Sequence, residues 1–103
     1  MSDPSLPTVD RGLGVTAPAG FRAGAATCGI KASGRPDLAV LVADRDVPAA
    51  AVFTSNRVTG AAVQVSRDHL ARRRTMRGVV ASSGNANTCT GARGLADARE
   101  MLR

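Results

Sequence analysis

The sequence is poor in the large side chains that usually fill a protein core. It contains no Trp, no Tyr and only two Phe in 103 residues. Leu, Ile, Val and Phe together number 21, which lies at the edge of the composition typical of disordered proteins. Many of the remaining apolar residues are Ala, 19 in all. This length supports one domain, and we expect it to have a thin core and to fold best against further polypeptide.

Other absences exclude whole classes of protein. No stretch approaches the roughly 18 consecutive apolar residues that a transmembrane helix needs. The only cysteines, Cys28 and Cys89, lie far apart and outside any metal-binding spacing, so a disulfide scaffold and a metal site are disfavoured and a reducing compartment is expected. Residues 1–14 show no basic region followed by an apolar run. They are predicted to be a loose leader and not a signal peptide, which places the protein in the cytoplasm.

Positive charge exceeds negative charge, with a formal net charge of +6. The excess is almost entirely Arg, 13 residues against the single Lys31. A cluster at Arg72, Arg73, Arg74 and Arg77 leaves open a small basic binding module that takes a phosphate-rich partner. The near absence of aromatic side chains argues against binding of single-stranded nucleic acid, and a solvated surface cluster is the simpler interpretation.

The distribution of apolar residues predicts an α/β layer of about five strands and two helices within residues 15–103. The continuous apolar run 38–43, bounded by turns at 34–37 and 44–48, is typical of a strand covered on both faces. Val63 and Val65 alternate with polar or small residues, which indicates a half-buried strand. Ser66 is a suitable N-cap for a short helix after it. The predicted strands are 21–30, 38–43, 49–54, 61–66 and 78–82, and the predicted helices are 67–74 and 94–103.

A polar loop from Ser82 to Gly91 is the strongest candidate functional segment. It joins a buried strand to the start of a helix, where α/β proteins present ligand-binding groups and where helix N–H donors are unpaired. Its Asn and Thr side chains can orient a small polar substrate, or they can satisfy the loop's own backbone. For Cys89 the alternative is a small buried side chain. The candidate residues are Ser83, Gly84, Asn85, Asn87, Cys89, Thr90 and Gly91.

At this loop the chain resembles a known family. Residues 79–91, Val-Val-Ala-Ser-Ser-Gly-Asn-Ala-Asn-Thr-Cys-Thr-Gly, resemble the Asn-Ser-Gly-Asn-Ala-Asn-Ala-Cys-Thr-Gly segment of the ornithine acetyltransferase family, also called ArgJ or glutamate N-acetyltransferase. Ser82 and Thr88 stand where the family usually has Asn and Ala. Further stretches resemble the family in the same order, so that the resemblance covers about residues 12–103: 15–23, 29–31 with 36–39, 51–58 and 94–98.

The resemblance implies the layered α/β sandwich of that family and an arginine-biosynthesis enzyme that transfers acetyl from N-acetylornithine to glutamate. Some members use acetyl-CoA as co-substrate, and no cofactor is implied. Family members are much longer precursors that cleave themselves before a threonine, and this threonine becomes the acetylated nucleophile. Thr16, Thr88 and Thr90 match no such position. The chain therefore resembles the N-terminal part of the α chain, without a catalytic residue.

The resemblance also implies the partners of the chain. These are the remaining α-chain sequence and the β chain of the same precursor, in a heterotetramer of two α and two β chains, with no membrane and no nucleic acid. A stand-alone α/β domain of unrelated use is the further alternative, which cooperative unfolding of the isolated chain would favour. The lone His69 is interpreted as a surface or capping residue.

Overall fold

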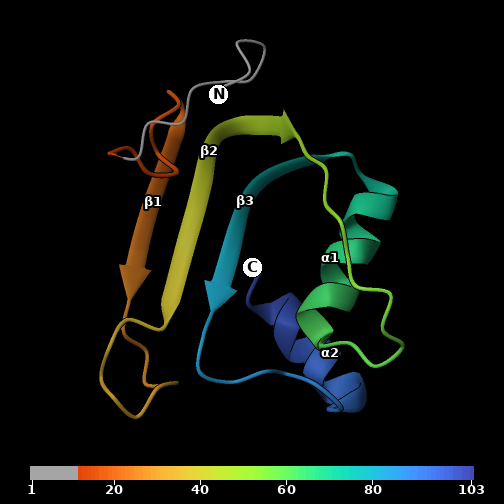
Figure 1. Cartoon of the computed structure of the whole chain (residues 1–103). Coiled ribbons are helices and arrows are strands. Elements are labelled where there is room, and N and C mark those ends of the chain that lie inside the picture. Colours follow the sequence, from red (N-terminus) through yellow and green to blue (C-terminus); the bar gives the residue numbers. More distant parts are fainter. Residues whose placement is uncertain (1–11) are drawn as a thin grey trace, which may run out of the picture.

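The computed structural model describes residues 12–103, which form a three-stranded antiparallel sheet and two helices (Figure 1). Strand β2 is central, with β1 and β3 antiparallel on either side. The mixed α/β class is confirmed, with three strands in the described residues where about five were expected. The bounds of the elements are Phe21–Ala26 (β1), Leu38–Pro48 (β2), Ala61–Arg72 (α1), Thr75–Ser82 (β3) and Gly91–Glu100 (α2).

Both faces of the sheet carry apolar side chains. Leu41 of β2 pairs with Val79 of β3, and the adjacent Val40 pairs with Val80. Successive side chains of a strand point to opposite faces, so these two pairs lie on opposite faces. The apolar run at 38–43 therefore forms a strand that needs cover on both sides, as its pattern predicts.

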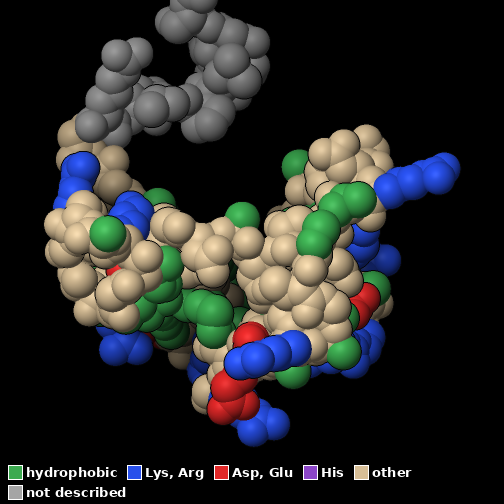
Figure 2. Space-filling model, turned by 90° about the horizontal axis from the view of Figure 1, so that it is seen from below, with side chains coloured by type: hydrophobic (Ala, Val, Ile, Leu, Met, Phe, Trp, Pro, Cys, Tyr) green, Lys and Arg blue, Asp and Glu red, His purple; other side chains and the backbone are tan. Residues whose placement is uncertain are grey.

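Little of this apolar surface is buried. In residues 12–103, Ala43 and Ala61 are the buried hydrophobic side chains, whereas Val52 is 99% exposed and Val79 52% exposed. Figure 2 shows hydrophobic side chains in the hollowed middle of the molecule and Lys and Arg side chains around its edge. This architecture disfavours a self-contained domain.

The second half of the chain corrects a prediction. Residues 61–66 begin helix α1 and do not form a strand, and the helix is preceded by Gly60, well before the expected N-cap Ser66. Alanine is the strongest helix former, and two Ala residues open this segment. Val63, Ser66 and Leu70 are half-buried, a spacing of three and four residues that belongs to one face of a helix.

The end of β2 differs from a second prediction. The predicted turn at 44–48 belongs to β2, because Val42 pairs with Gly78 and Val47 pairs with Met76. Four residues of β2 thus lie opposite one residue of β3, which makes a bulge. Bulges bend the strand that carries the extra residues, and Figure 1 shows β2 bending near its end.

Residues 49–54, predicted as a strand, are irregular. The segment is held against α1 by Arg67. The Arg67 guanidinium lies 5.4 Å from the centre of the Phe53 ring and donates a 3.1 Å hydrogen bond to the carbonyl of Thr54. A cation over an aromatic ring is attracted to it, so this contact fixes the path of the chain into α1.

Candidate functional site

The polar loop between β3 and α2 borders open space on two sides. Asn87, Cys89, Thr90 and Gly91 line a hollow shared with the segment that leads into α1. The remaining candidate residues face hollows beside α2, which they share with Asn87. Among these residues, Asn87 alone borders all three hollows. These candidate residues of the loop, named from the sequence, therefore lie on the wall of a hollow: Ser83, Gly84, Asn85, Asn87, Cys89, Thr90 and Gly91.

Asn87 connects the starts of both helices. Its side-chain amide donates a 2.8 Å hydrogen bond to the carbonyl of Gly94, and its side-chain oxygen accepts one from the Thr90 hydroxyl. Its backbone carbonyl accepts a 2.8 Å hydrogen bond from the N–H of Ala61, the first residue of α1. Both ends of the Asn87 side chain are thus used within the chain, so Asn87 positions the site. Asn85, in contrast, is exposed and its amide has no partner in the described residues.

Close packing joins α2 to the loop at Gly94. Gly94 is buried in the first turns of α2. A Cβ atom built there would lie 2.7 Å from Oδ1 of Asn87 and would collide with the Thr90 hydroxyl. Thr90 is the N-cap residue, yet its hydroxyl makes no capping bond and turns to Asn87 instead. The absence of a side chain at Gly94 is therefore a condition for the loop geometry.

Cys89 is the one described residue other than glycine with a positive φ, at 59°. This left-handed conformation costs an ordinary residue about 1–2 kcal/mol. The Cys89 thiol is free and exposed, so the interpretation of Cys89 as a buried side chain is wrong. Backbone strain of this kind persists where the surrounding structure holds it, and here the bridge between Thr88 and Gly60 precedes it directly.

The loop between β1 and β2 supports the candidate site from the other side. The Ser83 N–H donates a 2.9 Å hydrogen bond to the carbonyl of Asp37. Gly84, with φ +104°, packs so closely that a Cβ would lie 2.7 Å from Cγ of Lys31. Ile30 borders the same hollow as Asn85. The first strand, predicted over 21–30, is shorter in the structure, because β1 ends at Ala26.

The Asp37 carboxylate organises that β1–β2 loop. Asp37 is 2% exposed and accepts hydrogen bonds from the N–H groups of Cys28 (2.8 Å), Ile30 (2.7 Å) and Lys31 (3.1 Å). The Cys28 thiol donates a further bond of 3.1 Å. Donors to the charged form favour ionisation, and the bonds from Cys28, first of all its N–H, hold the pKa of Asp37 far below its usual range. The same contact with the carboxylate raises the pKa of the Cys28 thiol.

The opposite wall of the hollow at Cys89 is formed by the segment 57–59, which is not among the candidate residues predicted from the sequence. Arg57, Val58 and Thr59 line it. The segment lies in irregular chain just before Gly60, where no periodic pattern marks it. Arg57 has no ion pair or hydrogen bond among residues 12–103, so the hollow offers a cation beside the first residues of both helices, Ala61 and Gly91.

The arginine cluster is largely engaged within the fold. Arg73 and Arg77 lie 3.4 Å and 3.8 Å from carboxylate oxygens of Asp46, and Arg72 donates to a backbone carbonyl of its own helix. Exposed pairs of this kind contribute little to stability, but they reduce the free positive charge. The cluster is therefore a weak candidate for a phosphate-binding surface.

The remaining candidates have structural explanations. His69, predicted to be a surface or capping residue, is half-buried, and its Nε2 lies 3.2 Å from the carbonyl of Thr75, the first residue of β3, so the ring joins α1 to β3. Within the described residues, no group of three or more metal-ligating side chains gathers. None of the helices there is both long and apolar enough to cross a membrane.

Comparison with known proteins gives a consistent result. Residues 22–103 match the model of the ArgJ family. The chain is 48% identical over 87 residues to the arginine biosynthesis bifunctional protein ArgJ of Synechococcus sp. and 51% identical over 88 residues to that of Thermobifida fusca. These alignments cover 84% of this chain but 21% and 23% of the relatives, so the chain spans about a fifth of the length of the curated relatives it matches.

Solved structures agree in fold. The crystal structure of ornithine acetyltransferase from Mycobacterium tuberculosis, complexed with ornithine, is similar with a TM-score of 0.85 and 46% identity over 90% of this chain and 48% of that chain. The ArgJ structure from Bacillus halodurans is similar with a TM-score of 0.75 and 37% identity, over 81% of this chain and 43% of that chain.

Proposed function

The chain belongs to the ArgJ family, and on this premise we propose that it is the N-terminal part of an acetyltransferase that moves acetyl from N-acetylornithine to glutamate. One observation carries the proposal. The family match extends through the polar loop, and this loop lines a hollow that is also bordered by the first residues of α1 and α2 and by Arg57. Helix N-termini and a guanidinium both favour carboxylate groups, which amino-acid substrates carry.

The reacting group belongs to polypeptide outside this chain. A threonine hydroxyl attacks the acetyl carbonyl of N-acetylornithine, the amine of ornithine leaves with a proton, and an acetyl-threonine ester remains. The amine of glutamate then attacks the ester, which releases N-acetylglutamate and restores the hydroxyl. Acetyl-CoA would serve as an alternative acetyl donor for the same ester.

Relative lengths support a two-chain enzyme. This chain matches about a fifth of the curated relatives but nearly half of the crystallised chain from Mycobacterium tuberculosis. The crystallised polypeptide is thus about half as long as a curated relative, as expected of a precursor divided into an α and a β chain. We assign this chain to the α chain, in a heterotetramer of two α and two β chains.

In this proposal the loop shapes the acyl-substrate pocket and takes no part in bond making. Asn87 and Thr90 are bound to each other and hold the helices. Asn85 is the loop amide left free for a substrate, and it borders the hollows beside α2. Cys89, through its positive φ, sets the direction of the backbone between Asn87 and Thr90.

The test is a hybrid enzyme in which this chain replaces the matching residues of the Mycobacterium tuberculosis ornithine acetyltransferase. We expect the hybrid to form N-acetylglutamate from N-acetylornithine and glutamate, measured by mass spectrometry, and the isolated chain to form none above background. A hybrid that folds and assembles but stays inactive would contradict the proposal. Activity of the isolated chain would contradict the placement of the nucleophile elsewhere.

Substitution of Cys89 separates thiol chemistry from backbone conformation. In the hybrid we expect Cys89→Gly to keep acetyl transfer within about threefold, because glycine adopts positive φ without strain. Cys89→Val should lower kcat by about tenfold or more, because a β-branched residue resists this conformation. Steady-state kinetics of both variants give the comparison. Equal loss in both variants would show that the thiol itself acts.

A further inference from the structure

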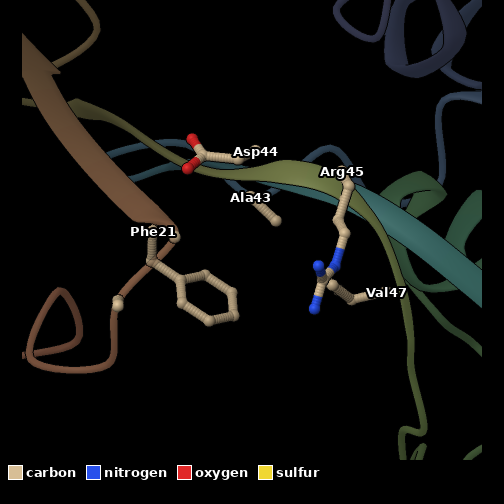
Figure 3. A pocket seen from close by; sticks show the side chains of 7 residues that line it. Phe21, Ala43, Asp44, Arg45 and Val47 are labelled. Carbon is tan, nitrogen blue, oxygen red and sulfur yellow. The ribbon is translucent and has the colours of Figure 1, made fainter.

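A groove crosses one face of the sheet, on the side to which Phe21 points. Two adjoining hollows form it, and they share Phe21, Ala43 and Val47. Figure 3 shows these three side chains on the same side of the ribbon, together with that of Arg45, while Asp44 points to the other side. The wall of the second hollow continues over Val79 of β3.

No element of the described chain covers this groove. In residues 12–103 the extensive contacts between elements are those between neighbouring strands and those between α1 and α2. Val79 remains half exposed as a result, and Phe21 and Val47 are only partly buried. Apolar side chains on a central strand and its neighbours normally lie under a second layer.

Arg45 is the unusual member of this face. Its side chain has no hydrogen bond or ion pair among the described residues, although carboxylates lie close by in the sequence. Asp44 pairs with Arg22 at 3.5 Å, and Asp46 pairs with Arg73 and Arg77. The neighbouring carboxylates are therefore already paired with other arginines. The Arg45 guanidinium, which points to the same side as the Phe21 ring, is left for a group from elsewhere (Figure 3).

We propose that this groove is the docking surface for a segment of the remaining polypeptide of the enzyme, with apolar side chains against Phe21 and Val79 and a carboxylate paired with Arg45. The inference rests on the proposed function, since it takes the occupant from the same enzyme. Relatives about five times as long as the matched stretch supply ample chain for such a segment. Covering the groove would desolvate the guanidinium, so a charged partner is required.

Charge argues against a second copy of this chain as the occupant. A symmetric pair would place the same groove against itself, and the carboxylate that lines it, Asp44, is already paired with Arg22. Each copy also carries a net charge of +6, so like charges would oppose association.

The first test identifies the carboxylate in the assembled hybrid enzyme. Arg45→Lys introduces an amine that a carbodiimide can couple to an adjacent Asp or Glu without a spacer. We expect mass spectrometry to find a cross-link from Lys at this position to an acidic residue outside the 103 residues. The matched control is Arg35→Lys, at an exposed arginine without a side-chain partner in the described residues, where no such link should form. A link between two copies of this chain, or no link in assembled enzyme, overturns the proposal.

The second test measures association directly and remains decisive if the hybrid is inactive. This chain, carrying an affinity tag, is co-expressed with the remaining polypeptide of the Mycobacterium tuberculosis enzyme, and the co-purified amount is measured. Arg45→Glu and Val79→Asp should each reduce recovery at least tenfold, and Arg35→Glu should leave it unchanged. Unchanged recovery in the first two variants overturns the groove, while an active hybrid would still uphold the proposed function. The opposite result is an inactive hybrid together with co-purification that is lost in the Arg45→Glu variant. That result would overturn the proposed function and keep the docking surface.

Discussion

Replacing Gly94 by alanine is expected to destabilise the hybrid enzyme by about 3 kcal/mol and to remove most acetyl transfer. The added Cβ would occupy the space of the Thr90 hydroxyl and would press on Oδ1 of Asn87. Overpacking of this kind costs about 1–3 kcal/mol. Moving the two side chains would also break the hydrogen bonds of Asn87 to Gly94 and Thr90, each contributing about 0.5–1.5 kcal/mol. Thermal unfolding and steady-state kinetics report the two effects.

Two further variants test the cause of that loss. Gly24→Ala in β1 is the matched control, because nothing lies within 4 Å of its added Cβ in the described chain, and its melting temperature should stay near that of the parent. Thr90→Gly removes the atoms that collide, so the double variant should be more stable than the sum of the single losses predicts. Strict additivity would show that the contact with Thr90 does not explain why Gly94 lacks a side chain.

The predictability of the fold differs between its parts for physical reasons. The runs that became β2, β3 and α2 carry strong apolar patterns, and their existence followed from the sequence with shifted ends. The segment at Ala61 was ambiguous because Val63 and Val65 suit one face of a strand and also half-buried positions of a helix. The helix is also joined to a segment distant in sequence by the hydrogen bond from Ala61 to the carbonyl of Asn87, which no local pattern encodes.

The candidate site was likewise predictable from the sequence only in part. The polar loop was recognisable because it follows a predicted buried strand at a helix start and because a family resemblance ran through it. Arg57 was missed, since it lies in irregular chain and joins the hollow only in three dimensions. The role of Asp37 was missed as well. It was interpreted as a turn residue, and only the folded loop shows three N–H groups converging on its carboxylate.

Replacing Asp37 by asparagine is expected to lower the melting temperature of the hybrid enzyme by several degrees at neutral pH. An amide keeps one acceptor oxygen, but its NH₂ group would face the N–H donors of Ile30 or Cys28. The pKa of Asp37 is lowered in the folded chain, so its contribution is complete above the ordinary carboxyl pKa near 4. That contribution falls as the pH drops below this value toward the folded-state pKa. The difference between parent and variant should therefore shrink in acid.

Asp68→Asn provides the control, since Asp68 is exposed and its carboxylate has no partner in residues 12–103. The melting temperature of this variant should follow that of the parent at every pH.

The Cys28 thiol supplies an independent readout of the Asp37 carboxylate. The carboxylate beside it raises the pKa of Cys28, which lowers the thiolate fraction and slows alkylation. Asp37→Asn removes that charge, so iodoacetamide should label Cys28 faster, with Cys89 of the same molecule as the reference. An unchanged labelling rate of Cys28, together with an unchanged pH dependence of the melting temperature, would show that the Asp37 carboxylate does not organise this loop. Another group would then have to hold the loop in the position at which the Asp37 carbonyl binds the N–H of Ser83.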